Sequence, residues 1–136
     1  MLNTFQLIKL YFLTLPVYLL VDGFWLMVIA KSFYAKHLGY LMSPKPNLFA
    51  AGLFYLGYVI GILIFAIIPS LKEGSLNKAL LLGALFGVFC YATYDLTNWA
   101  TVKEWPWFIA VIDIVWGSIV TMIVAGAGYL LGKRFL

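Results

Sequence analysis

The sequence predicts an all-α protein, a polytopic membrane helix bundle with four transmembrane helices. Hydrophobic residues make up 65% of the chain and charged residues only 10%, and the mean hydropathy is +1.02. The apolar residues lie in four long runs, each near the roughly 20 residues that cross the hydrocarbon core of a bilayer. These runs lack the period-two alternation of membrane strands. We therefore expect one integral membrane domain over residues 1–136.

The four predicted spans cover residues 5–30, 48–68, 79–100 and 107–131. Pro16 lacks a backbone N–H group and predicts a bend in the first span, and Pro69 predicts the end of the second. No basic residue precedes the first run and no small-residue cleavage site follows it, so we interpret it as a span rather than a signal peptide.

The connection between the first two spans, residues 31–47, is the longest of the three. Its mixture of apolar and basic residues predicts a short helix along the membrane interface. Pro44 and Pro46 would end that helix before the second span. The chain's single cysteine, Cys90, excludes an internal disulfide.

Four spans place both termini on one side of the membrane. Five cations lie on the terminal side and four on the other: Lys9, Lys72, Lys78, Lys133 and Arg134 against Lys31, Lys36, Lys45 and Lys103. The pair at the C-terminus favours cytoplasmic termini, and the near balance also permits dual insertion and a homodimer. Because most cations lie between apolar runs, where they anchor helix ends, we expect no nucleic-acid partner. The glycine pairs at four-residue spacing, such as Gly83 and Gly87, predict close helix packing within one bundle.

Three aspartates lie inside the apolar runs: Asp22, Asp95 and Asp113. A carboxylate is costly in hydrocarbon, so it normally faces the bundle interior and has a partner or a function. At 1.5 Å per residue, all three fall roughly 8–12 Å below the same membrane surface. Three separate helices therefore bring a carboxylate to one layer, which predicts a buried acidic site.

Aromatic and polar residues accompany the aspartates at helical spacing. Trp25 follows Asp22 by three residues and Trp116 follows Asp113 by three, which places each pair on one helix face. We predict a ligand-binding set in this layer: Asp22, Trp25, Tyr91, Tyr94, Asp95, Thr97, Asn98, Asp113 and Trp116. The alternative is a structural network in which tyrosine, asparagine and threonine satisfy the acids.

No lysine or arginine lies at the depth of the acids, so their charge requires a proton or an external cation. Lys36, His37 and Lys45 of the first connection lie on the same side and are candidates for a lid that contacts phosphate. The acids lack the paired spacing of a metal-binding helix, so we assign no metal site. Nucleophile elbows, phosphate loops and paired cysteines are also absent. No catalytic residue or cofactor is assigned, and enzymatic activity stays an open question.

The segments YATYDLTNWATVKEWP, residues 91–106, and VIDIVWG, residues 111–117, carry a resemblance. With the Asp-x-x-Trp of the first span, they make the chain similar to a bacterial family of small four-helix inner-membrane proteins described as a domain of unknown function. The resemblance implies a location in the bacterial inner membrane. Members of that family look associated with genes of membrane-lipid modification, so the resemblance favours a lipid.

These observations favour a membrane protein that binds, or binds and modifies, a lipid headgroup or a small polar or cationic ligand. The membrane lipid is then the expected partner. A proton-coupled transporter acting as a homodimer is one alternative, although transport sites usually lie nearer the bilayer midplane. A non-catalytic structural membrane protein is the other.

Overall fold

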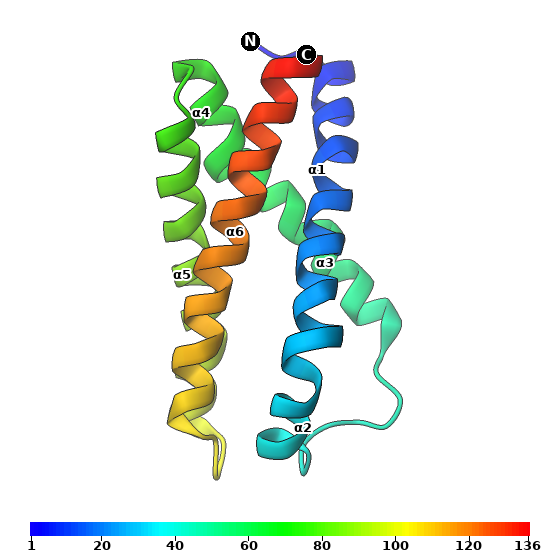
Figure 1. Cartoon of the computed structure of the whole chain (residues 1–136), viewed down its shortest axis with the longest axis vertical. Helices are drawn as coiled ribbons and strands as arrows, with labels where there is room; N and C mark the ends of the chain where they lie inside the picture. Colours follow the sequence, from blue (N-terminus) through cyan, green and yellow to red (C-terminus); the bar gives the residue numbers. More distant parts are fainter.

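The computed structural model describes residues 1–136 as a bundle of four long helical rods without strands (Figure 1). Each rod is long and apolar enough to cross a membrane: Thr4–Leu38, Leu48–Glu73, Leu76–Thr101 and Trp107–Phe135. Both termini lie at one end of the bundle, where the Lys9 ammonium donates to the carbonyl of Phe135 at 2.8 Å. The predicted all-α fold with four spans is confirmed.

The first rod comprises α1 (Thr4–Phe24), the π-helix η1 (Trp25–Ala30) and α2 (Lys31–Leu38). It begins at a capping box, in which the Asn3 side chain accepts from the Gln6 backbone and the Gln6 side chain accepts from that of Asn3. The helix predicted in the connection is α2, which continues the first rod instead of standing apart from it. α1 passes through Pro16, and the non-α segment of this rod is η1.

The second rod comprises α3 (Leu48–Ile62), the π-helix η2 (Leu63–Ile67) and α4 (Ile68–Glu73). The sequence predicted that this rod ends at Pro69, but the rod continues beyond Pro69 to Glu73. Proline lies at the start of α4, where a missing N–H group is tolerated, and the wider turn of η2 comes immediately before it. The rod ends instead at Gly74, whose φ of 66° only glycine adopts readily.

The third and fourth rods are α5 (Leu76–Thr101) and α6 (Trp107–Phe135), and they form the closest helix pair of the bundle. A Cβ atom on Gly87 would overlap the carbonyl oxygen of Gly117, and one on Gly83 would lie 2.8 Å from that of Thr121. These glycines therefore serve packing within the bundle, as predicted.

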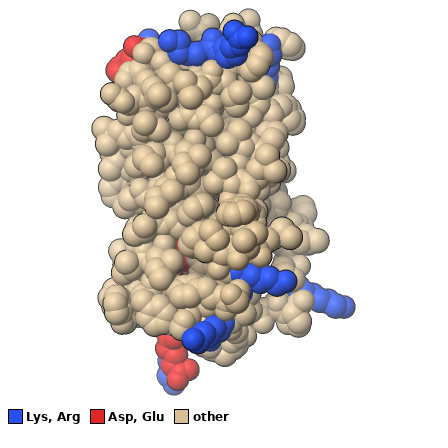
Figure 2. Space-filling view, viewed as in Figure 1, with Lys and Arg blue, Asp and Glu red and all other residues tan.

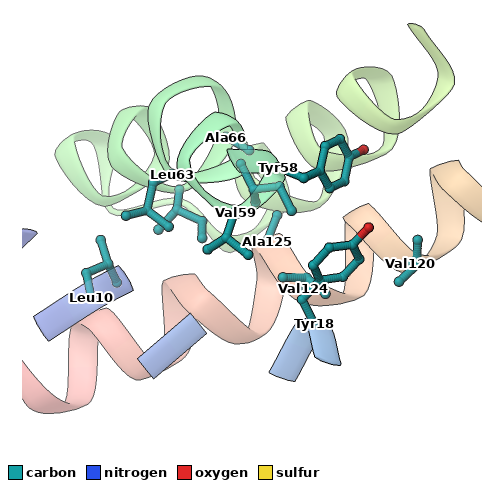
Figure 3. Close-up of a cluster of buried hydrophobic side chains, with 11 residues drawn as sticks. Leu10, Tyr18, Tyr58, Val59, Leu63, Ala66, Val120, Val124 and Ala125 are labelled. Atoms are coloured by element: carbon teal, nitrogen blue, oxygen red, sulfur yellow. The ribbon is translucent and has the colours of Figure 1, made fainter. Parts of the chain in front are cut away.

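Buried and mostly apolar side chains pack into a core inside the bundle (Figure 3). This core joins α1, α3, η2 and α6: Leu10, Tyr18, Tyr58, Val59, Ile62, Leu63, Ala66, Ile67, Val120, Val124 and Ala125. The outer surface is apolar along its length, with lysine and arginine gathered near the two ends (Figure 2). Such a band between two charged rims is typical of a membrane-spanning bundle.

The end of the bundle away from the termini is looser. α5 packs along α6 and against η2, whereas α3 leans away from α5 towards Leu48 (Figure 1). Figure 1 also shows α2 at this end, beside the connection to α3. Cavities lined by residues of several rods lie at this end.

Candidate functional site

Asp22 joins three rods near the end of α1. Its side chain is buried, with 6% exposed. One carboxyl oxygen accepts from the Tyr55 hydroxyl of α3 at 2.6 Å, and the other accepts from the Trp116 indole N–H of α6 at 3.0 Å. Each oxygen thus has a donor, which offsets the cost of burying the carboxyl group.

Two indole rings lie parallel beside this carboxyl. The rings of Trp25 and Trp116 stack with their centroids 4.3 Å apart and their planes 9° from parallel. The two Asp-x-x-Trp segments of the sequence therefore meet across the bundle. Trp116 takes part in both interactions, because its ring stacks while its N–H donates to Asp22. The Trp25 N–H is buried without a partner.

Asp113 on α6 is tied to the first rod by α2. The hydroxyl of Tyr34 donates to its Oδ1 atom. The His37 ring packs edge-on against Phe33 and Phe108, with centroids 4.9 Å and 4.7 Å away. These contacts hold α2 against the start of α6 and bring its tyrosine to the acid.

Asp95 differs from the other two aspartates because it is fully buried and neither of its oxygens has a hydrogen-bond donor. Its carboxyl group lies close enough to Asp113 for the two to interact. Two adjacent carboxylates in a dry site repel each other, and one proton held by the pair would remove half of that charge. No lysine, arginine or histidine pairs with any of the three aspartates, since the only ion pair of the chain joins Lys78 to Glu73.

Two adjoining cavities open around these acids, with volumes of about 330 and 300 Å³. Both are lined by Tyr91, Tyr94 and Asp113. The first adds Phe54 and Cys90. The second adds residues of the first rod, the connection, α3 and α6: Asp22, Trp25, Leu26, Tyr34, Leu38, Met42, Tyr55 and Trp116. The combined lining is aromatic and acidic, and it contains no basic side chain.

Six of the nine residues predicted to bind a ligand line these cavities: Asp22, Trp25, Tyr91, Tyr94, Asp113 and Trp116. Asp95 is fully buried and lines neither cavity. Thr97 is exposed on the outside of α5, and the Asn98 carbonyl accepts from the Val102 N–H at the helix end. Neither Thr97 nor Asn98 lines a cavity. α5 thus turns its tyrosines, and not its whole polar stripe, towards the space.

The predicted lid residues do not line either cavity. Lys36 and Lys45 are exposed, and His37 is half-buried between aromatic rings. The residues of the connection that line the second cavity are Tyr34, Leu38 and Met42, and none of them is basic. The predicted contact of Lys36 and Lys45 with the phosphate of a ligand stays a prediction. It requires these two lysines to reach the mouth of the cavity.

Sequence reasoning missed Tyr34 and Tyr55, the hydroxyl donors to Asp113 and Asp22. Neither tyrosine has an acid at helical spacing in its own segment, so no local pattern marks it. Both hydrogen bonds are made between side chains of different rods. The only available signal was the presence of tyrosines near the predicted acidic layer, and it does not single out these two.

The three aspartates do not form a single cluster. No three histidine, cysteine, aspartate or glutamate side chains lie together in a way that could hold a metal ion. Asp22 has its own donors, and only Asp95 and Asp113 form a pair.

Fold and site together define a multi-pass integral membrane protein with a buried, hydrogen-bonded aspartate. The chain belongs to the family described as "Predicted membrane protein (DUF2177)", whose model matches residues 7–130. The predicted membership of a membrane protein family of unknown function is thereby confirmed. No curated protein and no solved structure matches the chain.

Proposed function

We propose that this protein binds the head of a lipid, or another small polar or cationic ligand, in the paired cavities around Asp113. The observation that carries the proposal is that Asp113 lines both cavities while no basic side chain lies in either. A ligand that brings positive charge or hydrogen-bond donors would offset the cost of the buried acids. Membrane lipid is the proposed partner.

The walls of the cavities support an amphiphile. Tyrosine and tryptophan combine an apolar ring with a polar tip, and they favour positions where one end of a ligand is apolar and the other is wet. The cavities lie towards the end of the bundle away from the termini, and a volume of about 300 Å³ suits a small head.

A proton-coupled transporter is the second candidate, and the adjacent Asp95 and Asp113 carboxyls favour it, since such a pair can take up and release a proton. Against it, the fully buried core residues Ile62, Ile67 and Val124 lie between these cavities and the end of the bundle that carries the termini. A site without an opening towards the end that carries the termini supports binding better than passage. A purely structural role would leave the cavities without a ligand.

The site is proposed to face the outer side of a bacterial inner membrane, with the termini in the cytoplasm. Figure 2 shows basic residues gathered at the end of the bundle that carries the termini. Membrane proteins generally carry more lysine and arginine on their cytoplasmic side, which supports this orientation. A reporter that is active only outside the cytoplasm, fused after Leu136, should be inactive. An active fusion would reverse the orientation.

Native mass spectrometry with lipid analysis tests the binding proposal. We expect a specific ligand to co-purify with the wild-type protein and to be lost from Asp113→Asn. Glu104→Gln is the matched control, because it removes one carboxylate at the same end of the bundle outside the cavities. Equal ligand content in all three proteins, or a folded wild type with no ligand, would refute the proposal.

A further inference from the structure

We propose that the ligand is a membrane lipid with a primary ammonium head, and that it reaches Asp113 sideways from the bilayer through an opening between α3 and α5. This inference rests on the proposed function and adds to it the chemistry of the head and the route. Its evidence is the placement of the first cavity, its depth in the bundle and the charge of its back wall.

The opening is formed where α3 and α5 diverge, and we call it the lateral opening: Phe54 on α3, with Cys90, Tyr91 and Tyr94 on α5. Phe54 is 49% exposed and Tyr94 is 57% exposed, so both residues lie at the outer edge. Asp113 on α6 forms the back wall of the same cavity. A continuous space thus joins the outside of the bundle to the acid.

The lateral opening lies at a depth where the surroundings are hydrocarbon. Phe54 follows the first residue of α3 by six positions, and Cys90 precedes the last residue of α5 by eleven. At 1.5 Å per residue, these positions lie about 9 and 16 Å from the helix ends. A hydrocarbon core about 30 Å thick covers that range. A molecule that uses this opening is therefore one already dissolved in the membrane.

The acidic residues at the back of the first cavity determine which lipid headgroup can bind there. Asp113 receives one hydroxyl donor, from Tyr34, and its neighbour Asp95 receives none. An anionic head would add charge of the same sign, whereas a primary ammonium offers three N–H donors to carboxylate oxygens. The rings of Tyr91 and Tyr94 can add cation–π attraction. A quaternary ammonium has no N–H and would leave the carboxyl oxygens without donors.

The second cavity provides the competing route. It is reached beside Leu38 and Met42 of the connection, at the membrane surface, where a water-soluble amine would arrive. The two routes share Asp113, so loss of binding in Asp113→Asn cannot distinguish them. A probe at the lateral opening is required.

Photocrosslinking from the lateral opening tests the inference. The full chain carries photoreactive p-benzoylphenylalanine in place of Phe54, in vesicles of equal phosphatidylethanolamine and phosphatidylglycerol. The matched control carries it in place of Phe89, which is 68% exposed on the same rod as Cys90 and lines neither cavity. We expect adducts at position 54 to be enriched in the ethanolamine lipid at least several-fold over those at position 89, and the enrichment to disappear in Asp113→Asn.

Equal adduct composition at positions 54 and 89 would overturn the inference. If native mass spectrometry still showed a ligand that depends on Asp113, the proposed function would stand and the route beside Leu38 would replace the lateral one. Enrichment of phosphatidylglycerol at position 54 would overturn the assignment of the head. As a second variant, Cys90→Phe should slow lipid exchange by about tenfold through narrowing of the opening, with Cys90→Ser as its control. Unchanged exchange in Cys90→Phe would also contradict the route.

Discussion

Replacing Tyr55 with phenylalanine measures whether Asp22 carries a charge. The substitution keeps the ring and removes a hydroxyl that donates to the carboxyl at 2.6 Å. A hydrogen bond to a charged group contributes about 1.5–3 kcal/mol, whereas hydrogen bonds between neutral groups in membrane proteins average about 0.6 kcal/mol. Because Asp22 is buried and has a donor on each oxygen, we expect the free energy of unfolding to fall by about 2 kcal/mol.

Tyr58 supplies a matched control three residues further along α3. Its hydroxyl lies 2.8 Å from that of Thr121, which itself donates to the Gly117 carbonyl, so the contact of Tyr58 is a neutral hydrogen bond. Tyr58→Phe should cost about 0.6 kcal/mol. Reversible unfolding in mixed micelles or bicelles measures both values.

Two outcomes, the first from comparing Tyr55→Phe with Tyr58→Phe, would refute this assignment. Equal losses near 0.6 kcal/mol for both variants would show that the carboxyl of Asp22 is neutral or that the hydrogen bond is weak. Tyr55→Phe in an Asp22→Asn background should cost less than in the wild type, because the charged acceptor is gone. A cost that does not change would contradict the assigned contact.

Three further predictions use the same unfolding measurement. Gly87→Ala should lower the free energy of unfolding by about 1–3 kcal/mol, because the added carbon meets the backbone of α6. Gly57→Ala, which places its carbon in open space, should leave the stability unchanged or raise it. Equal effects of the two substitutions would contradict the packing of α5 on α6. Trp116→Phe should cost about 1.5–3 kcal/mol through its lost N–H donor, and Trp25→Phe, whose N–H has no partner, should cost less; the reverse order would exclude the assigned hydrogen bond. Asp95→Asn should change the free energy of unfolding by less than about 1 kcal/mol, as expected when a neutral carboxyl group is replaced by an amide. A gain in stability of several kcal/mol would show instead that Asp95 is an unpaired buried charge.

The sequence contained the overall fold because span length and apolar composition are local properties of each run. The ends of the rods were less predictable. Pro69 looked like a terminator, but it stands at the start of α4 after a π-helical turn, where its missing N–H group costs little. The continuation of the first rod into α2 depends on contacts between α2 and α6, such as that of His37 with Phe108, which no local pattern encodes.

The acids of the candidate site could be picked out because a carboxylate in an apolar run is rare. Their partners could not. Tyr34 and Tyr55 reach Asp113 and Asp22 from other rods, and which tyrosine meets which acid depends on how the rods cross. Thr97 shows the opposite error, since it shares a segment with Asp95 but lies on the outside of α5.

The most direct test of the central claim is a distance between the ligand and the acids by solid-state NMR. Aspartate labelled with ¹³C marks only Asp22, Asp95 and Asp113, the three aspartates of the chain, and ¹⁵N-labelled phosphatidylethanolamine marks the head. We predict a dipolar coupling from the ammonium nitrogen to a carboxyl carbon of the site, at about the 4 Å of an ion pair, which is absent in Asp113→Asn and retained in Glu104→Gln. A folded wild-type protein in this lipid with no such coupling would contradict an ammonium-binding site.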